Sequence, residues 1–125
     1  MILDTNALSA AADSYPEVLA ILAGADEIAL PVIVLGEYRY GIAQSRNRAD
    51  YEKWLHGLLP DCAVLEVNEE TSRHYAAINV ELRRAGKPIP TNDLWIAALA
   101  RQHSLAILSR DQHFDWVPGN RRIDW

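Results

Sequence analysis

The sequence predicts an α/β fold in which a mainly parallel central sheet is flanked by helices. Short apolar segments with strand character alternate with longer segments of helical spacing, a pattern typical of right-handed βαβ units. The length of 125 residues suits one hydrophobic core, and no repeat, linker or low-complexity segment divides the chain. We therefore expect a single domain that covers residues 1–125.

In the first half of the chain, two short apolar segments are predicted to be strands, at residues 1–4 and 27–30. Four helices are expected between and after them, at residues 7–13, 17–23, 31–44 and 48–59. Asn6 can cap the first of these helices, while Pro16 and Pro31 suit the starts of the next two.

In the second half, strands are expected at residues 62–67, 105–108 and, more weakly, 122–125. Asn68 suits the start of a helix that is predicted to end near Arg84. Thr91 or Asn92 is expected to cap a helix over residues 93–103, which is almost wholly apolar and therefore predicted to be buried. A turn or short helix is predicted at residues 109–114.

The composition narrows the class of protein. Half of the residues are hydrophobic and 23% are charged, which is typical of a globular domain. The formal net charge of -5 argues against binding of nucleic acid by charge alone. The single cysteine, Cys62, excludes an internal disulfide and a cysteine-rich zinc site. Because there is no basic leader and no apolar run of about 18 residues, we expect a soluble cytoplasmic protein.

Four acidic residues occupy positions of functional interest. In open parallel sheets, ligands bind at the carboxyl ends of the strands. Asp4 ends the first predicted strand, Asp111 follows the fourth, and Asp93 opens the buried helix. Glu37 shares a helical face with apolar neighbours three or four residues away, where a mere surface charge is uncommon.

Each of these acids also has a simpler interpretation. Asp4 can cap the first helix, Asp93 can serve the helix dipole, and Asp111 can be a turn residue; for the last two, taken alone, we prefer that interpretation. Glu37 can pair with Arg39 or with a distant arginine. Several carboxylates in one low-dielectric crevice, however, repel one another and raise their pKa values. A hard cation such as Mg²⁺ or Mn²⁺ relieves this repulsion, so the combination predicts a metal site.

The motifs around these acids follow one another in a distinctive order. They are Asp4-Thr5-Asn6 after a short apolar strand, Glu37 in a helix ending near Gly41, Asn92-Asp93 followed by Trp95-Ile96-Ala97, and Ser109-Arg110-Asp111 with Phe114. Along essentially the whole chain this pattern resembles the PIN-domain nucleases, most closely the VapC-type toxins of toxin–antitoxin systems. The resemblance implies a PIN-like domain, an endoribonuclease dependent on Mg²⁺ or Mn²⁺, a homodimer, and an antitoxin partner whose C-terminal segment covers the active site.

The resemblance also implies the roles of individual residues. The catalytic and metal-binding quartet falls on Asp4, Glu37, Asp93 and Asp111, with supporting roles for Thr5, Asn6, Asn92 and Ser109. Threonine is more usual in the family at the position of Ser109. Family members often carry an aspartate just before the phenylalanine, where this chain has His113. Asp111 can therefore share its role with Asp115, or act only through a water.

The implied reaction is hydrolysis of an RNA phosphodiester by metal-activated water, with one or two ions held by the quartet. Local basic side chains would contact the RNA, and the first candidates are Arg46, Arg48, Lys87 and Arg110. Further candidates are the pairs Arg83-Arg84 and Arg121-Arg122. The four histidines, at positions 56, 74, 103 and 113, lack zinc-ligand spacing, and surface or packing roles are predicted for them.

Two other functions stay open at this point. A Mg²⁺-dependent phosphoryl-transfer enzyme could use Asp4 as its nucleophile, but such enzymes of the haloacid-dehalogenase kind have a second acid two residues later, where this chain has Asn6. A non-catalytic PIN-like binding module is the other alternative. Failure to bind Mn²⁺ at millimolar concentration would favour that module.

Overall fold

Five short strands form one sheet in the computed structural model, which describes residues 1–125. The strands are β1 (Ile2–Leu3), β2 (Ala29–Pro31), β3 (Ala63–Leu65), β4 (Ile107–Leu108) and β5 (Arg122–Ile123). Their order across the sheet is β3-β2-β1-β4-β5, and all neighbouring strands are parallel. The predicted α/β class is confirmed, and the sheet is wholly rather than mainly parallel.

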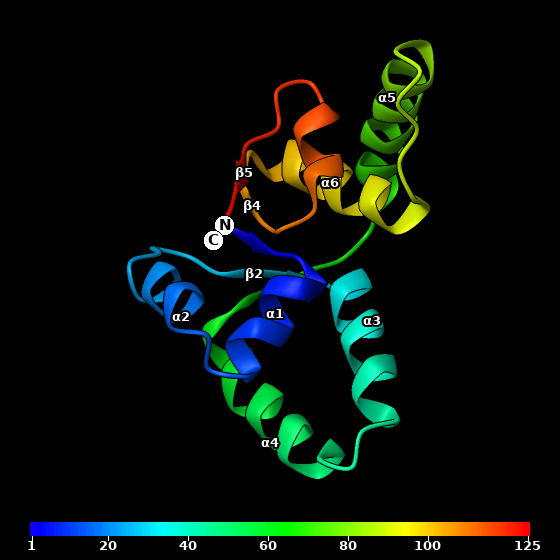
Figure 1. Cartoon of the computed structure of the whole chain (residues 1–125). Helices are drawn as coiled ribbons and strands as arrows, with labels where there is room; N and C mark the ends of the chain where they lie inside the picture. Colours follow the sequence, from blue (N-terminus) through cyan, green and yellow to red (C-terminus); the bar gives the residue numbers. More distant parts are fainter.

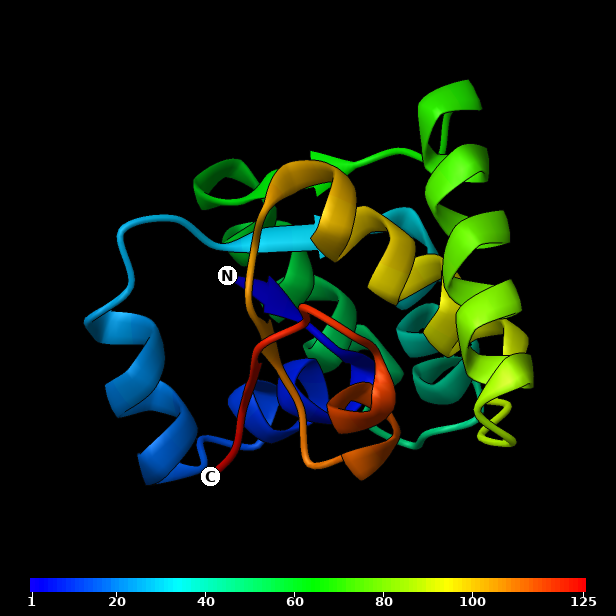
Figure 2. The ribbon, with the colours of Figure 1, turned by 90° about the horizontal axis from the view of Figure 1, so that it is seen from above.

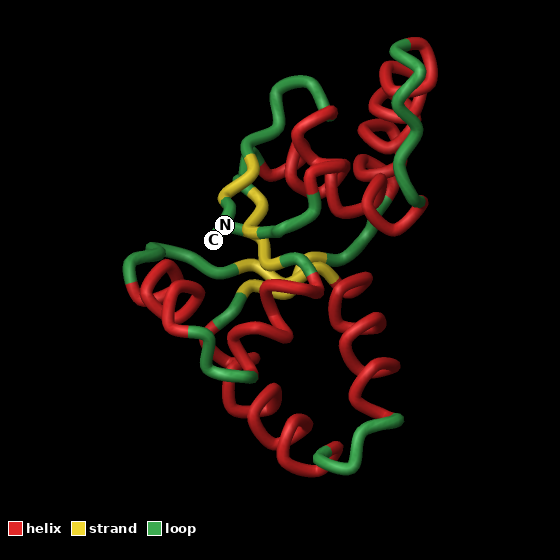
Figure 3. The backbone as a smooth tube through the Cα atoms, viewed as in Figure 1, coloured by secondary structure: helices red, strands yellow, loops and turns green.

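Six α-helices connect these strands. They are α1 (Thr5–Ala12), α2 (Pro16–Ala23), α3 (Val32–Ala43), α4 (Arg48–Leu58), α5 (Glu69–Arg84) and α6 (Thr91–His103). Helices α1 to α4 lie on one side of the central strands, and α5 and α6 lie on the other (Figure 1, Figure 3). Figure 2 shows α5, in light green, at the margin of the molecule beside α6. Two short 3₁₀ helices, η1 (Leu59–Asp61) and η2 (Gln112–Trp116), complete the chain.

The observed strands are shorter than the predicted ones. The second strand extends through Pro31, and α3 begins one residue later than expected, at Val32. The last strand ends at Ile123 rather than at Trp125. The ends of each strand depend on its hydrogen bonds with the adjacent strand, and the local sequence does not predict these.

The register of the strands determines which residues share the carboxyl edge of the sheet. Leu3 of β1 pairs with Leu108 of β4, so the next residues, Asp4 and Ser109, emerge side by side. The backbone N–H of Asp4 donates to the carbonyl of Leu108 at 3.1 Å, and that of Ser109 donates to the carbonyl of Ile123 at 3.0 Å. Two motifs that are far apart in sequence therefore meet at one edge.

The strands and α6 make up the centre of the hydrophobic core. Ile2, Leu3, Ile107 and Leu108 are fully buried. Helix α6 buries Leu94 and residues 96–100, which confirms the predicted buried helix. Burying one large aliphatic side chain stabilises a fold by about 1.5–3 kcal/mol, so this packing fixes the strand ends firmly. No helix combines the length and the apolar character that crossing a membrane requires.

The start of α1 differs from the prediction. The helix begins at Thr5, and its cap is Asp4, whose side chain accepts a hydrogen bond from the Thr5 N–H. Asn6, the predicted cap, lies inside the first turn. The difference arises because Asp4 leaves β1 with extended backbone angles and is thus already in the conformation that a cap requires.

The start of α6 also differs from the prediction. The helix begins directly after Pro90 without a side-chain cap, so neither Thr91 nor Asn92 fills that role. The carbonyl of Pro90 accepts the first helical hydrogen bond, from the Leu94 N–H at 3.0 Å. Because the proline ring presets the backbone, the helix needs no capping side chain, and Asn92 stays available to the site.

Candidate active site

Asp4 lies at the centre of the carboxyl edge, with only 5% of its surface exposed. Its Oδ1 accepts a hydrogen bond from the Thr5 N–H at 2.8 Å. Its Oδ2 accepts from the Ser109 hydroxyl at 2.7 Å and from the Asn6 side-chain amide at 3.2 Å. Three of the predicted supporting residues therefore orient one carboxylate, which also caps α1.

Ser109 links the ends of β1 and β4. It is fully buried, and its hydroxyl oxygen accepts hydrogen bonds from the Asp111 N–H at 2.9 Å and from the Asn6 amide at 3.2 Å. The side-chain oxygen of Asn6 in turn accepts from the Arg110 N–H at 3.3 Å. These bonds tie the loop after β4 to the start of α1, and they fix where Asp111 lies.

Asp93, Asp111 and His113 form the tightest group in the site. Asp111 caps η2, accepting a hydrogen bond from the His113 N–H at 2.9 Å. The imidazole Nδ1 of His113 lies 2.9 Å from Asp111 Oδ1 and 3.3 Å from Asp93 Oδ2. One potential ligand atom from each of the three residues lies within 4.8 Å of the other two. His113 is partly exposed and packs against Trp116, in keeping with the predicted surface or packing role, but its contact with two acids of the site was not predicted.

Asp115 does not join this group. It is half exposed, and both of its carboxylate oxygens pair with the Arg122 guanidinium at 2.9 Å. This pairing lowers the pKa of Asp115. Asp115 is engaged by Arg122 and does not belong to the group of Asp93, Asp111 and His113, so the structure gives no support to a role shared with Asp111. For His113, the one indication in the sequence of a place in the site was its position before Phe114, where members of the family often have an aspartate.

Glu37 approaches the site from α3. Burial raises the pKa of its carboxyl, and the neighbouring charge of Asp4 raises it further, while the side chains of Thr5 and Asn92 act in the opposite direction. Glu37 forms no ion pair with Arg39 or with any other arginine. The carboxylate therefore faces Asp4 rather than a positive partner.

Positive charge is scarce among these acids. Burial raises the pKa of Asp4, and the charge of Asp111 adds to that effect although hydrogen bonds such as that from Ser109 oppose it. Burial likewise raises the pKa of Asp93 to about 6. Repulsion from Asp111 and Asp4 also raises it, and the hydrogen bond with His113 acts in the opposite direction. No lysine or arginine pairs with any acid of the quartet.

The basic residues predicted to contact RNA are dispersed. Arg48 pairs with Glu52 at 3.1 Å along α4, and Arg122 is engaged by Asp115. The guanidinium of Arg110 lies over the rings of Tyr15 and Trp125, at 5.6 and 4.8 Å from their centroids. Arg46 and Lys87 are exposed and form no ion pair. The site thus depends on its acids and on one imidazole.

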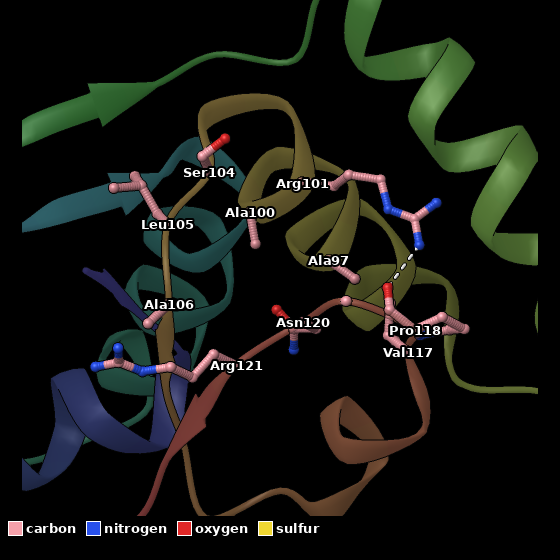
Figure 4. Close-up of a pocket in the computed structure, with 11 residues that line it drawn as sticks. Ala97, Ala100, Arg101, Ser104, Leu105, Ala106, Val117, Pro118, Asn120 and Arg121 are labelled. Carbon is pink, nitrogen blue, oxygen red and sulfur yellow. Dashed lines mark hydrogen bonds between the residues drawn. The ribbon is translucent and has the colours of Figure 1, made fainter.

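Two hollows lie at different ends of the sheet. A groove of about 250 Å³ between α1, α3 and α4 adjoins the acids, with Thr5 and Glu37 in its wall. A larger cavity of about 420 Å³ lies at the amino-terminal edge, between the end of α6 and the segments that precede β4 and β5 (Figure 4). No acidic side chain lines this second cavity.

Comparison with known proteins gives a consistent match. The sequence profile of the PIN domain matches residues 1–120. The VapC ribonuclease Y4jK of Sinorhizobium fredii is 32% identical over 122 residues, covering 89% of this chain and 86% of that protein. The structure of VapBC2 from Rickettsia felis bound to a promoter DNA fragment matches with a TM-score of 0.86 and 26% identity, over 99% of this chain and 97% of that chain.

A further solved structure, VapBC-5 from Mycobacterium tuberculosis, is a member of the VapBC family of toxin–antitoxin systems. It matches with a TM-score of 0.75 and 28% identity, over 98% of this chain and 94% of that chain. The fold and the edge of carboxylates define an α/β domain with an acidic active site. The chain belongs to the PIN-domain family, and within it to the relatives of the VapC ribonucleases.

Proposed function

We propose that this protein is an endoribonuclease dependent on Mg²⁺ or Mn²⁺ and is the toxin of a toxin–antitoxin pair. The observation that carries the proposal is the close group of Asp93, Asp111 and His113 beside the buried Asp4, with no lysine or arginine paired with these acids. Glu37 on α3 adds a fourth carboxylate, whose pKa the charge of Asp4 raises. Retaining buried like charges is costly unless a cation offsets them. The ribonuclease relatives support RNA as the substrate.

The residues present suit a hard divalent cation. The carboxylates of Asp4, Glu37, Asp93 and Asp111 would hold it, because both Mg²⁺ and Mn²⁺ bind carboxylate oxygens. When bound, such an ion lowers the pKa of its water and stabilises charge on the leaving oxygen of the phosphodiester.

The chain's own contribution is orientation. The Thr5 N–H and the Ser109 hydroxyl hold the two oxygens of Asp4 in fixed directions. The Ser109 oxygen also holds the loop that carries Asp111. Fixing the carboxylates before substrate arrives lowers the reorganisation that catalysis requires.

The proposal includes two protein partners. The VapBC structures similar to this chain support an antitoxin that binds it, and a homodimer is proposed from the family resemblance. Size-exclusion chromatography with light scattering, on the chain alone and on the chain co-expressed with its neighbouring gene product, tests both. A monomer throughout would contradict the dimer, and absence of any complex would contradict the antitoxin.

RNA contact is proposed for the exposed basic side chains, first Arg46 and Lys87. Binding should weaken as salt rises, since phosphate contacts release counterions. An Arg46→Ala variant with unchanged affinity and unchanged salt dependence would remove that residue from the proposal.

Phosphoryl transfer through Asp4 is disfavoured by the same geometry. Enzymes of the haloacid-dehalogenase kind carry a second acid two residues after the nucleophile, whereas this chain has Asn6, whose side-chain amide donates to Asp4 Oδ2 at 3.2 Å. A non-catalytic binding module would have no use for several carboxylates held close enough to raise one another's pKa.

The decisive experiment is cleavage of total cellular RNA by protein freed of antitoxin. We expect cleavage with Mg²⁺ or Mn²⁺ and none with a chelator. Asp4→Asn and Asp93→Asn should each lower the rate by more than about 100-fold, because even groups that only support a metal ligand contribute 10- to 100-fold. Asp50→Asn, at an exposed position on α4, is the matched control and should cleave normally. No cleavage by folded wild type with any divalent metal would contradict the proposal.

A further inference from the structure

His113 is the only basic side chain that contacts the acids of the site. Its Nδ1 bridges the carboxylates of Asp111 and Asp93 at 2.9 and 3.3 Å. The neighbouring Arg110 is directed elsewhere, over the rings of Tyr15 and Trp125. The imidazole thus adds a nitrogen atom to a site that otherwise offers only oxygen.

The three side chains are close enough to serve one ion. Their potential ligand atoms all lie within 4.8 Å of one another. Ligand atoms at about 2.1 Å from one octahedral ion are separated by about 3 Å when adjacent and about 4.2 Å when opposite. Asp93, Asp111 and His113 therefore need only small side-chain adjustments to share an ion.

The His113 ring is oriented and accessible at the same time. Its backbone N–H is held by Asp111 at 2.9 Å, and the ring packs against Trp116 with centroids 5.1 Å apart. The side chain is 38% exposed, whereas that of Asp93 is 15% exposed. The imidazole is therefore open to solvent, as is Asp111 at 31% exposure, while Asp93 lies deeper.

We propose that His113 is a nitrogen ligand of the metal site, and that it makes the site prefer Mn²⁺, or a related transition ion, over Mg²⁺. The inference rests on the metal-dependent function proposed above and specifies which ion serves it. Imidazole nitrogen suits first-row transition ions, whereas Mg²⁺ requires oxygen ligands and gives up its waters reluctantly. A carboxylate at position 113 would instead give an all-oxygen site.

The competing role for His113 is that of a positive counter-charge that leaves when the ion binds. In that case the imidazole would oppose metal binding, and removal of the imidazole would strengthen metal binding. The two roles therefore predict opposite effects of the same substitution, His113→Ala. His56→Ala provides the matched control, because His56 is exposed on α4 and lies outside the site.

The test measures binding of Mn²⁺ and of Mg²⁺ to the metal-free wild type, His113→Ala, His113→Asp and His56→Ala by calorimetry. Pulsed electron paramagnetic resonance of the Mn²⁺-loaded proteins adds a direct reading of nitrogen coordination. We expect the spin echo of bound Mn²⁺ to be modulated by an imidazole nitrogen in wild type and in His56→Ala. Neither His113 variant should show this modulation. His113→Ala should bind Mn²⁺ about tenfold or more weakly. His113→Asp should retain Mn²⁺ binding and lower the ratio of Mn²⁺ to Mg²⁺ affinity by about tenfold.

Bound Mn²⁺ without nitrogen modulation in wild type would overturn the proposal. Mn²⁺ binding by His113→Ala that equals or exceeds that of wild type would also overturn it, and would make His113 a counter-charge. A wild type that binds neither ion would overturn the proposed function itself. The failure of the ligand role and the failure of the metal-dependent function are thus distinguishable.

Discussion

The two edges of the sheet offer a ligand very different surroundings. The amino-terminal edge has the larger cavity, about 420 Å³, but its Arg101 already pairs with Glu81 at 3.0 Å and donates to the Pro118 carbonyl at 2.8 Å (Figure 4). The carboxyl edge adjoins a smaller groove of about 250 Å³. Its acids Asp4, which is buried, and Asp93, which is 15% exposed, repel one another and have no lysine or arginine partner.

The difference shows that the charges without partners, and not the larger cavity volume, mark the edge where a cation would be stabilised. At the amino-terminal edge Arg101 has its partners, and Arg121, the other charged residue of the wall, is exposed to solvent. At the carboxyl edge, burial raises the pKa of Asp4 and Asp93, which means that the folded protein disfavours their charged forms. A cation bound there relieves that penalty.

The largest expected effect is stabilisation by metal, confined to the carboxyl edge. Mn²⁺ at about 100 times its Kd should raise the free energy of unfolding by about 2.7 kcal/mol, because it binds only the folded state. That corresponds to about 10 °C in Tm for a domain of this size. Differential scanning calorimetry of metal-free protein measures it. Asp93→Asn should lose the response, and Arg121→Ala, in the wall of the other cavity, should retain it. Equal stabilisation of Asp93→Asn would mean that the ion binds elsewhere.

A smaller effect is expected from the two serines that flank β4. Ser109→Ala removes the donor to Asp4 and the acceptor for the Asp111 N–H, and should lower the rate of RNA cleavage by about 10- to 100-fold. Ser104, in the wall of the amino-terminal cavity, has a positive φ of 54° that glycine also adopts. Ser104→Gly should therefore leave both cleavage and stability nearly unchanged. Cleavage assays corrected for the folded fraction measure the difference, and an equal loss in both variants would contradict the contrast between the edges.

The smallest effect is expected at the amino-terminal edge itself. Arg101→Ala removes a two-bond pairing with Glu81 that joins α6 to α5, and both side chains are partly exposed. The free energy of unfolding should fall by about 1 kcal/mol, as expected for ion pairs that water screens. Urea denaturation measures this change. The cleavage rate per folded molecule should stay at the wild-type value, and a large loss of rate would give this cavity a part in the reaction.

Much of the fold could be predicted from local pattern. The alternation of apolar segments and helical spacing gave the α/β class, and the apolar run in α6 predicted its burial, which Leu94 and residues 96–100 bear out. The helix caps were predicted less well. Asn6 and Asp4 are both good capping residues, and the choice between them depends on where β1 ends, which pairing with β4 determines.

The candidate site divides in the same way. Asp4, Glu37, Asp93 and Asp111 were predicted from their places after strands and on helices, together with a family resemblance. His113 was noted only as a departure from the family pattern before Phe114, because a lone histidine has no metal-ligand spacing that would assign it to the site. Only folding shows that η2, capped by Asp111, turns the ring of His113 toward Asp93, twenty residues away in sequence.

By itself, the sequence determined the order of strands and helices, the buried helix, and the acids available for a metal site, because these depend on neighbouring residues along the chain. Only the tertiary structure decided which of those acids meet, how far each is buried, and that His113 replaces Asp115 beside Asp111. Such properties depend on strand register and on the packing of distant segments. The Ser109–Asp4 hydrogen bond, between residues 105 positions apart, is one such contact that no local pattern contains.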